Sequence, residues 1–366
     1  MRKKVVIAAG GTGGHLFPAQ ALATSLKEKC PDIEVLFMAK GLQNNKHFQK
    51  ELFSFQDVIS SSLSKNPLKL IYGCIQLLQG SLQSRKAMQK FSPDLVIGFG
   101  SYHTFPVLFA ASFQRIPIIL HESNSIAGKV NRFFSKKAHW TGVFFPEAKK
   151  SFKGASRQVT VPLRKEFEAD ARPSKKQALE YYGLDPNKKT ILVFGGSQGA
   201  RGINELFLEA LSFVEAKQTI QVLHFTGSTS TAVAAYVRYG IKAQVKEFEP
   251  HMQYAWAACD FVVSRSGAAS IAEQIAFQVP AIMIPYPYAA DNHQAKNAEF
   301  VEKVIQGAIV LEEKTLEPKR LAAAVLSLLD DATNAQMKAN LMAHFVQCKN
   351  SDFSDEILQF LKGDML

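Results

Sequence analysis

Residues 4–20 read KVVIAAGGTGGHLFPAQ, a short apolar run followed by four glycines in five residues and then a histidine. The apolar run is typical of a buried strand. Glycines between a strand and a helix let backbone N–H groups approach a phosphate, and the helix N-terminus adds about half a positive charge. The stretch predicts an α/β fold with a phosphate site, although a tight turn without a ligand would have the same pattern. The residues that follow have the spacing of one helix face: Ala19, Leu22, Ala23 and Leu26.

The same pattern recurs 185 positions later, where residues 189–211 read KTILVFGGSQGARGINELFLEAL. This shift aligns Gly10 with Gly195 and Gly14 with Gly199. Apolar runs with the length of strands alternate with helical periodicity through both halves, which is typical of doubly wound parallel sheets. We therefore expect two Rossmann-like domains that face one cleft.

The length of the chain also favours two domains, because 366 residues exceed what one core usually fills. We expect an N-terminal domain over residues 1–163, a C-terminal domain over 164–340, and a last helix within 341–366 that returns to the N-terminal domain. The polar stretch 163–177 is the expected linker. Apolar runs fall far short of the roughly 20 residues of a membrane span, so we expect a cytoplasmic protein. Four distant cysteines, at positions 30, 74, 259 and 348, fit buried, reduced thiols.

The charge is divided unevenly along the chain. Residues 1–164 hold 23 Lys and Arg against 8 Asp and Glu, a net charge of +15, whereas residues 165–366 hold 20 against 24, a net charge of −4. The basic half suggests an anionic partner, such as a nucleic acid, an acidic membrane surface or a phosphorylated acceptor. Improved solubility is the alternative explanation.

Two common classes of phosphate-binding enzyme are disfavoured. The first loop does not fit G-x-G-x-x-G, because Gly11 and Gly13 would require glycine or alanine at Leu16. The second strand ends FMAKG, without an acidic residue for a cofactor ribose, and the sequence contains no G-x-x-x-x-G-K-[ST]. A nicotinamide dehydrogenase and a P-loop kinase are therefore poor interpretations, and we expect no cofactor.

A second group of polar residues follows the apolar run DFVV. In SRSGAASIAEQ, residues 264–274, Ser266 is a candidate N-cap and Glu273 lies two turns further on the same helix face. The Glu273 carboxylate could accept hydrogen bonds from both ribose hydroxyls of a nucleotide held at that helix N-terminus. It could equally be a solvated helix residue. The amides and hydroxyl-binding groups of PYPYAADNHQAKNA, residues 285–298, suit a sugar.

Together with HESNSIAG at residues 121–128, these motifs resemble, in the same order, those of the MurG family. The resemblance implies a GT-B fold of two Rossmann-like domains and inverting transfer of N-acetylglucosamine from UDP-N-acetylglucosamine to the C4 hydroxyl of the muramyl sugar of lipid I. The product would be lipid II for peptidoglycan synthesis. The resemblance also implies peripheral attachment to the cytoplasmic face of the cell membrane and contact with other cell-wall synthesis proteins.

The resemblance assigns roles to individual residues. His15 matches the candidate general base, Glu273 the ribose ligand and Gln294 the group that binds the sugar hydroxyls. The backbone of Glu249 matches the uracil contact. The donor-binding residues that it implies are Thr12, Gly13, Gly14, Asn124, Arg164, Ser197, Glu249, Ala268, Ala269, Ser270, Ile271, Ala272, Glu273 and Gln294. Because both substrates are diphosphates, we assign the acceptor diphosphate to the first glycine loop, two of whose glycines are also among these donor residues, and to GFGSY: Gly11, Gly13, Gly14, Gly100, Ser101 and Tyr102.

The chain departs from the family pattern at three places. GFGSY has Ser101 where the family has a glycine, and TVPLR keeps Pro162 and Arg164 but lacks the family's asparagine. HESN has Ser123 where glutamine is common. The sequence has neither a D-x-D triplet nor histidines with metal-ligand spacing, so we expect no metal site. Helix N-termini, Ser197 and Arg164 would then stabilise the departing UDP.

Residues 65–91 read KNPLKLIYGCIQLLQGSLQSRKAMQKF and combine apolar helical spacing with flanking basic residues. Such a pattern favours an interfacial membrane patch, and core packing is the alternative. The patch consists of Leu68, Ile71, Ile75, Lys65 and Lys69, continued by Leu78 and Leu82.

The sequence is also compatible with other functions. The chain could be another GT-B enzyme that acts on UDP-N-acetylglucosamine, such as a UDP-sugar 2-epimerase or a transferase to a different lipid. It could also be a noncatalytic nucleotide-sugar binder recruited to membranes. Nucleic-acid binding would explain the charge but not the paired glycine loops.

Overall fold

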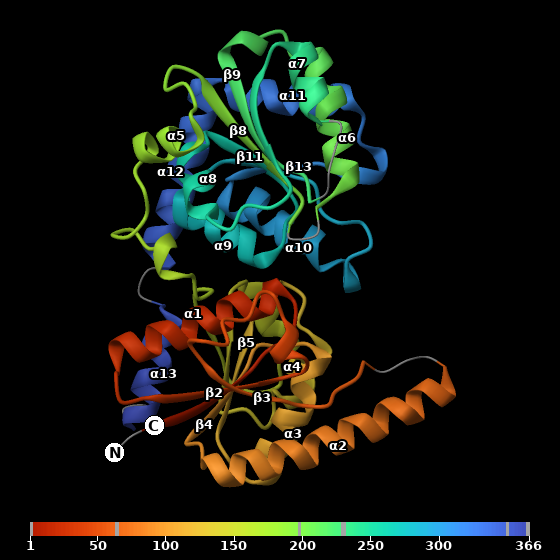
Figure 1. The fold of residues 1–366 in the computed structure, drawn as a ribbon, viewed down its shortest axis with the longest axis vertical. Coiled ribbons are helices and arrows are strands. Elements are labelled where there is room, and N and C mark those ends of the chain that lie inside the picture. The colour runs from red at the N-terminus through yellow and green to blue at the C-terminus, as the bar shows by residue number, and fades with distance from the viewer. Residues whose placement is uncertain (1–2, 63–65, 197–198, 228–231, 349–350, 364–366) are drawn as a thin grey trace. The chain divides into compact units, whose positions relative to one another are not determined.

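The computed structural model describes residues 3–62, 66–196, 199–227, 232–348 and 351–363. The chain divides into two compact units (Figure 1). Unit 1 consists of Met1–Lys165 and Lys349–Leu366, and unit 2 consists of Glu166–Cys348. Each unit is a parallel α/β sandwich, so the two-domain α/β prediction is confirmed.

Unit 1 contains a sheet in the order β3-β2-β1-β4-β5-β6-β7, seven strands among the described residues, all of them parallel. Val5 and Ile7 of β1 face one core and Val6 and Ala8 face another, because side chains alternate across a strand. This burial on both faces explains the continuous apolar run in the sequence. The strands are β1 (Lys4–Ala8), β2 (Glu34–Ala39), β3 (Ser54–Asp57), β4 (Leu95–Gly98), β5 (Ile118–Glu122), β6 (Trp140–Val143) and β7 (Ser156–Gln158).

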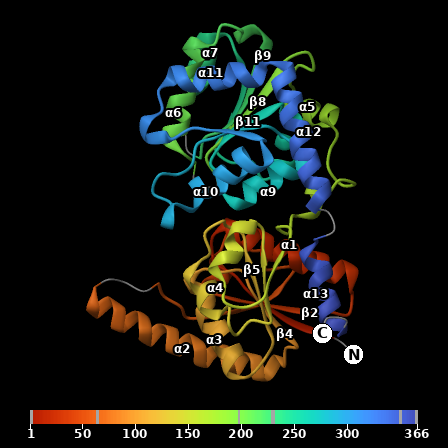
Figure 2. The ribbon, with the colours of Figure 1, turned by 180° about the vertical axis from the view of Figure 1, so that it is seen from behind.

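Helices cover both faces of this sheet. One face packs on α1 (Gly13–Lys29) and α13 (Phe353–Lys362), which place Leu16 and Phe353 in a core with Trp140. The opposite face packs on α2 (Pro67–Phe91), α3 (Phe105–Phe113) and α4 (Lys129–Phe134). Asn66 caps α2 by accepting hydrogen bonds from the backbone N–H groups of Leu68 and Lys69. The N-terminal half of α2 extends beyond the sheet in both views (Figures 1 and 2).

Unit 2 repeats this architecture with a parallel sheet in the order β10-β9-β8-β11-β12-β13. Helices α6, α7 and α11 pack together, as do α5, α8, α9 and α12 (Figure 2). The strands are β8 (Lys189–Phe194), β9 (Ile220–Phe225), β10 (Lys242–Lys246), β11 (Phe261–Ser264), β12 (Ala281–Met283) and β13 (Ala308–Val310). The helices are α5 (Lys175–Tyr182), α6 (Arg201–Ala210), α7 (Ala232–Tyr239), α8 (Met252–Ala258), α9 (Ala268–Phe277), α10 (His293–Phe300), α11 (Pro318–Leu329) and α12 (Asp331–Cys348).

The units divide at Lys165 and Cys348, whereas the sequence interpretation places these boundaries at residues 163 and 340. Helix α12 continues through residue 340 because its buried Asn334 and Leu341 pack within unit 2. The Asn334 amide donates to the backbone carbonyl of Asp260. The chain enters unit 1 again at Lys349, and α13 packs against α1.

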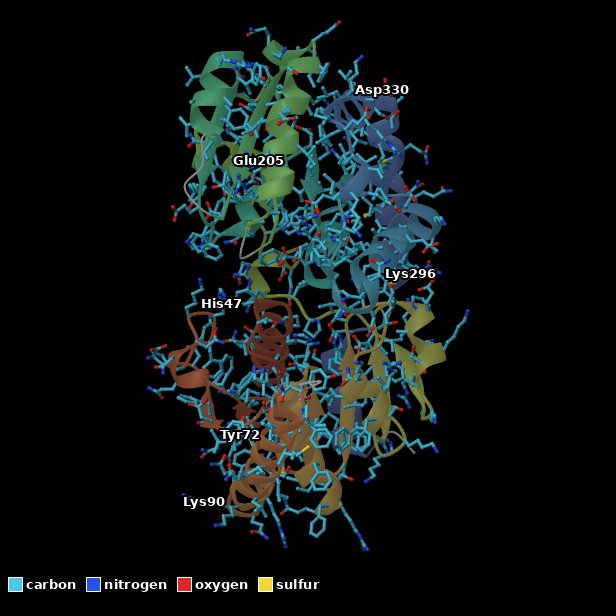
Figure 3. All side chains as sticks on the ribbon, turned by 90° about the vertical axis from the view of Figure 1, so that its right-hand side faces the viewer. His47, Tyr72, Lys90, Glu205, Lys296 and Asp330 are labelled. Atoms are coloured by element: carbon cyan, nitrogen blue, oxygen red, sulfur yellow. The ribbon has the colours of Figure 1, made fainter. Side chains whose placement is uncertain are left out.

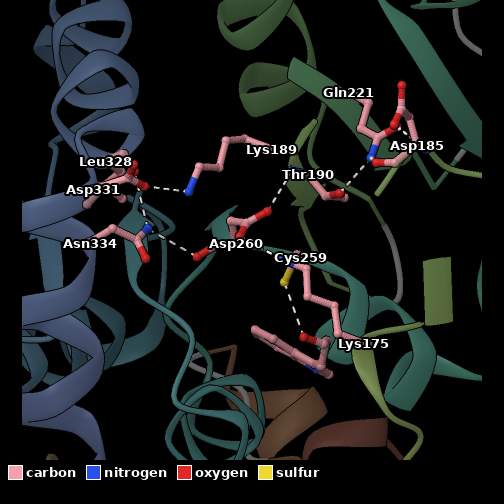
Figure 4. A network of polar contacts seen from close by, with 11 residues as sticks. Lys175, Asp185, Lys189, Thr190, Gln221, Cys259, Asp260, Leu328, Asp331 and Asn334 are labelled. Carbon is pink, nitrogen blue, oxygen red and sulfur yellow. Dashed lines mark hydrogen bonds and ion pairs between the residues drawn. The ribbon is translucent and has the colours of Figure 1, made fainter. Parts of the chain in front are cut away.

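A polar network joins α5, α12 and the N-terminal ends of β8 and β11 (Figure 4). The buried Asp260 carboxylate lies 2.6 Å from the Lys175 ammonium and accepts a 2.8 Å hydrogen bond from the backbone N–H of Thr190. At its edge, Lys189 lies 2.6 Å from Asp331, whose side chain is 84% exposed. This network lies at the amino-terminal ends of the strands, opposite their carboxyl ends.

The carboxyl ends of the strands are where doubly wound sheets bind ligands, at the point where strand order reverses. In unit 1 this switch point lies between β1 and β4, and in unit 2 it lies between β8 and β11. The loops after these four strands contain motifs that we predicted from the sequence: residues 9–14, 99–102, 195–196 with 199, and 265–267.

Candidate active site

The loop after β1 places a histidine at the first turn of α1. Thr12 has extended backbone angles and precedes the helix, and the backbone N–H of His15 donates to the Thr12 carbonyl at 3.1 Å. The Thr12 hydroxyl lies 3.2 Å from His15 Nδ1. The imidazole is half-buried. The predicted strand, glycine loop and helix are confirmed, and the loop holds His15 by a side-chain contact.

The structure brings the two predicted acceptor segments of unit 1 together. A Cβ atom on Gly10 would lie 2.7 Å from Ser101 Cβ and 3.3 Å from His15 Nδ1. Since real Cβ atoms do not approach so closely, only glycine at position 10 allows Ser101 to lie beside the histidine. The segments Gly11–Gly14 and Gly100–Tyr102 therefore share one side of the unit 1 switch point.

Ser101 has φ 79° and ψ 151°, a backbone conformation that is almost restricted to glycine. Gly100 before it has φ 80°. The Ser101 side chain accepts a hydrogen bond from the backbone N–H of His103 at 3.4 Å, and its carbonyl accepts one from the Thr104 hydroxyl at 2.9 Å. At position 101 the chain therefore differs from the family's glycine only by an added side chain, because the backbone keeps the conformation that glycine favours.

Sequence reasoning missed three polar residues around these loops. Asn45 donates its amide to the Gly11 carbonyl at 2.7 Å and fixes the first loop. Lys40, directly after β2, donates to the Ser60 carbonyl, and His103 Nδ1 lies 3.3 Å from the Ser60 hydroxyl. Burial, and then the charge of Lys40, lower the pKa of His103 below its usual value. The sequence pointed to these three residues only through their positions after the ends of strands.

Glu122 is a further residue without an assigned role, although it lies in the HESN motif. Its buried carboxylate accepts hydrogen bonds from the backbone N–H groups of Asn124 and Gly128 and from the Asn131 amide at 3.0 Å. Burial raises its pKa, and these hydrogen bonds oppose that shift. The Asn131 amide nitrogen would lie 3.2 Å from a Cβ on Gly100. Glu122 therefore organises both the Asn124 loop and the support behind Gly100.

Arg164 lies in unit 1, where its guanidinium carbon is 5.4 Å from the centre of the Phe17 ring. Phe17 is two residues after His15 on α1, so the arginine lies over the first turns of that helix. The predicted donor contact Asn124 is held by Glu122 in the same unit. Both residues are thus positioned in unit 1, and their contacts with a donor stay predictions.

The loop after β8 in unit 2 is built from glycine conformations. Gly196 has φ 101° and Gly199 has φ 73°. A Cβ on Gly195 would overlap Ala200, and one on Gly199 would overlap the Thr226 carbonyl. The turn therefore requires glycine, and it leads into α6 at Arg201, as the repeat predicts. The predicted donor residue Ser197 lies outside the described residues.

Helix α9 begins at Ala268, and its N-cap is Gly267 without a side-chain cap. The expectation that Ser266 caps this helix is wrong. Its buried hydroxyl instead donates a 2.8 Å hydrogen bond to the backbone carbonyl of Gln294, which ties α9 to α10. The segment from Ala268 to Glu273 forms the first turns of α9, with Ala268, Ile271 and Ala272 buried.

Glu273 is not a freely solvated helix residue. The indole Nε1–H of Trp256 donates a 2.8 Å hydrogen bond to Glu273 Oε2. Trp256, on α8, is 1% exposed and packs edge to face with Phe194, the last residue of β8. Sequence reasoning missed this tryptophan, which connects the predicted ribose ligand to β8, the strand that precedes the second glycine loop.

The segment that we predict to bind the sugar is also held in place by hydrogen bonds. Gln294 Oε1 accepts a 2.9 Å hydrogen bond from the backbone N–H of Tyr286. Arg265 forms two hydrogen bonds with the Glu313 carboxylate, at 2.8 and 2.9 Å, and donates to the carbonyls of Ile284 and Pro285. The Glu249 carboxylate is buried, lies 2.7 Å from Lys246 and accepts from the backbone N–H of His251. That side chain is therefore a structural element, consistent with a predicted role for the backbone only.

The apolar residues predicted on α2 are exposed, so packing in the core of unit 1 is the wrong interpretation for them. Leu68 is 78% exposed, Ile71 59% and Ile75 48%. Tyr72, 63% exposed, and Lys90 lie on the same helix (Figure 3). Lys69 is exposed as well, and Lys65 lies outside the described residues.

The described residues contain no cluster of three or more His, Cys, Asp or Glu side chains that could hold a metal ion. Among the described helices, none combines the length and apolarity that crossing a bilayer requires.

Residues 5–143 match the glycosyltransferase family 28 N-terminal domain, and residues 190–353 match the glycosyltransferase family 28 C-terminal domain. A protein of Protochlamydia amoebophila, named UDP-N-acetylglucosamine–N-acetylmuramyl-(pentapeptide) pyrophosphoryl-undecaprenol N-acetylglucosamine transferase, is 44% identical over 353 residues. The match covers 95% of this chain and 93% of that protein. The chain belongs to the MurG family.

Other comparisons agree with MurG membership. A Chlamydia pneumoniae protein of the same name is 35% identical, over 98% of this chain and 99% of its own length. The crystal structure of Acinetobacter baumannii MurG superposes with a TM-score of 0.76 at 22% identity, covering 99% of this chain and 100% of that one. The predicted GT-B fold and the resemblance to the MurG motifs are confirmed.

Proposed function

We propose that this chain transfers N-acetylglucosamine from UDP-N-acetylglucosamine, with inversion, to the C4 hydroxyl of the muramyl sugar of lipid I and so forms lipid II. One observation carries the proposal: a transferase bearing the name of this reaction is 44% identical over nearly the whole chain. Two preorganised switch-point sites, one in each unit, fit a reaction whose donor and acceptor both carry diphosphates.

His15 acts as the general base. When the Thr12 hydroxyl accepts a hydrogen bond from Nδ1–H, the basic lone pair of the imidazole lies on Nε2. That nitrogen then takes the proton of the acceptor C4 hydroxyl as the oxygen attacks the anomeric carbon, while the bond from that carbon to UDP breaks. The contact with Thr12 fixes the ring orientation before substrate binds.

Unit 2 holds the donor. Glu273, oriented by Trp256, accepts hydrogen bonds from the ribose hydroxyls, and the backbone at Glu249 meets uracil. Gln294 binds sugar hydroxyls, with its carboxamide oriented by the Tyr286 N–H. The segment from Ala268 to Ala272 and the loop before α6 offer helix N-termini to the UDP phosphates. Arg164 adds positive charge when UDP leaves.

Unit 1 holds the acceptor diphosphate. The segments Gly11–Gly14 and Gly100–Tyr102 supply backbone N–H groups, and Lys40 places a cation after the neighbouring strand. Asn45 keeps the first loop in place through the Gly11 carbonyl. The net charge of +15 over residues 1–164 favours this anionic substrate.

The exposed stripe of α2 attaches the chain to the cytoplasmic face of the cell membrane. Apolar side chains at Leu68, Ile71 and Ile75 enter the headgroup boundary, and basic residues such as Lys69 meet anionic lipids. Serine at these three apolar positions is expected to abolish flotation with anionic liposomes. Unchanged flotation would contradict membrane attachment.

Product analysis tests the transfer reaction. Purified enzyme receives labelled UDP-N-acetylglucosamine with a lipid I analogue, with and without exhaustive chelation of divalent metal. We expect label in a β-linked disaccharide product in both cases. Free N-acetylglucosamine or N-acetylmannosamine, formed equally without acceptor, would instead indicate an epimerase, and binding without turnover would indicate a noncatalytic binder.

A further inference from the structure

An apolar groove in unit 1 adjoins the acceptor loops. The groove has a volume of about 440 Å³, within the range of small-molecule sites. Leu77 and Leu78 of α2 line one side, and Phe105 and Phe109 of α3 line another. Phe133 of α4 completes the wall. Aromatic and aliphatic side chains thus form nearly all of its surface, which suits a hydrocarbon ligand.

The groove begins where the acceptor-diphosphate segment ends. Tyr102 lines it and directly follows Ser101, the residue that lies against Gly10 and beside His15. Lys129, at the first residue of α4, is the charged residue of the lining. A ligand with an anionic head on the Gly100–Tyr102 segment and a hydrocarbon chain bonded directly to that head would fit both features.

The groove borders the membrane stripe of α2, and the two surfaces share Leu78, which is 60% exposed. The helix presents Leu68, Ile71 and Ile75 to the surface, whereas Cys74, Leu77 and Ser81 face the groove. These two sets are adjacent stripes of one helix, each with spacing of three or four residues. One stripe can therefore meet lipid while the other holds a single bound chain.

We propose that this groove binds the first isoprenyl units of the polyprenyl diphosphate acceptor. The inference rests on the proposed function, in which the acceptor is a prenol joined to the muramyl sugar through a diphosphate. Because the prenol carbon is bonded to the diphosphate oxygen, its first units must lie within a few bonds of the Gly100–Tyr102 segment. The groove keeps these units out of water and aligns the headgroup with His15.

Cys74 provides a direct test, because this exposed thiol lines the groove. Alkylation of Cys74 by a maleimide is followed in a Cys30→Ser, Cys348→Ser background, with geranylgeranyl diphosphate as the probe. At a probe concentration of about ten times its Kd or more, we expect alkylation to slow about tenfold or more, because the bound chain covers the thiol. Inorganic diphosphate, and palmitate at the same concentration, are expected to leave the rate unchanged. No protection, or equal protection by palmitate, would overturn the proposal.

A groove-filling variant tests the same site during turnover. Cys74→Trp occupies the groove, and Gln79→Trp adds the same side chain to an exposed position of α2 that does not line the groove. With soluble lipid I analogues in the absence of membrane, Cys74→Trp should raise KM for a 20-carbon chain about tenfold and leave a short-chain analogue unaffected. Gln79→Trp should leave KM unchanged for both the long-chain and the short-chain analogue.

The outcomes separate this inference from the proposed function. If the wild type transfers sugar but Cys74→Trp leaves KM for the long chain unchanged, only the groove assignment fails. If prenyl diphosphate protects Cys74 but no lipid I analogue is glycosylated, the groove assignment stands and the proposed transfer fails.

Discussion

The indole Nε1–H of Trp256 donates a 2.8 Å hydrogen bond to the carboxylate of Glu273. Trp256 comes from α8 and Glu273 from α9. The bond therefore joins the helix that precedes β11 in the chain to the helix that follows it. Of the two carboxylate oxygens, Oε2 receives this bond. The contact therefore fixes the plane in which the carboxylate meets the ribose hydroxyls in our proposal.

Replacing Trp256 by Phe should weaken donor binding specifically through the ribose. We expect the KM for UDP-N-acetylglucosamine to rise about 3- to 20-fold (~0.7–1.8 kcal/mol) with little change in kcat, because the carboxylate loses the bond that orients it. Inhibition by UDP should weaken equally, but inhibition by 2′-deoxy-UDP should change less. For UDP and for 2′-deoxy-UDP, competitive inhibition assays measure the ratio of the inhibition constant of the variant to that of the wild type.

Trp140→Phe is the matched control, because Trp140 is also 1% exposed and its indole nitrogen has no hydrogen-bond partner among the described residues. It lies in unit 1. Equal losses for UDP and 2′-deoxy-UDP in Trp256→Phe would show that the tryptophan only supports packing.

Gly10→Ala should separate the acceptor loops. The new Cβ would lie 2.7 Å from Ser101 Cβ, so the Gly100–Tyr102 segment must move away from His15. We expect the acceptor KM to rise by about tenfold or more with UDP affinity unchanged. Ser101→Gly in the same chain removes the clashing atom and should restore most activity, as measured by transfer to a lipid I analogue. Failure of this rescue would show that the two loops do not act together.

The glycine loops and the alternation of strands and helices could be predicted because both depend on local patterns: apolar runs, glycine spacing and helical periodicity. Trp256 could not, because it precedes Glu273 by 17 residues and meets it only through the packing of α8 beside α9. The failed cap at Ser266 has a similar cause. Its hydroxyl finds the Gln294 carbonyl, a tertiary partner 28 residues away, while Gly267 takes the cap position. Local propensity therefore located each motif but not its partners.

The polar network of unit 2 contains two ion pairs whose carboxylates differ in burial: the Asp260 side chain is 7% exposed and the Asp331 side chain 84%. Asp260→Ala should lower the free energy of unfolding of unit 2 by about 2–4 kcal/mol, because the Thr190 N–H loses its side-chain acceptor and Lys175 its partner. Asp331→Ala removes an ion pair whose carboxylate is 84% exposed. This substitution should change the free energy of unfolding by less than about 0.5 kcal/mol.

Urea denaturation measures both values in a Trp140→Phe background, where the fluorescence of Trp256 reports on unit 2 alone. Equal effects of the two substitutions would contradict the assigned role of burial.

Unit 2 should lose stability below neutral pH through His224. Burial lowers the pKa of His224 to about 4, and the ring contacts Tyr236 and Asn204. Between pH 6.5 and 4 the unfolded chain therefore binds a proton that the folded chain does not. We expect His224 to remove about 2 kcal/mol of unfolding free energy from pH 7 to pH 5. Denaturation at several pH values should show a weaker slope in His224→Gln.

A slope that His224→Gln does not reduce would assign the acid sensitivity of unit 2 to other groups.

Single-turnover transfer by His15→Gln tests the central claim most directly. The variant retains a polar side chain beside Thr12 but cannot act as a base near neutral pH. With saturating UDP-N-acetylglucosamine and lipid I analogue, we predict a fall of about 10²- to 10⁴-fold in the rate of disaccharide formation, with the affinity for UDP unchanged. A rate within about threefold of the wild type, equivalent to less than 1 kcal/mol, would contradict the assignment of His15 as the base.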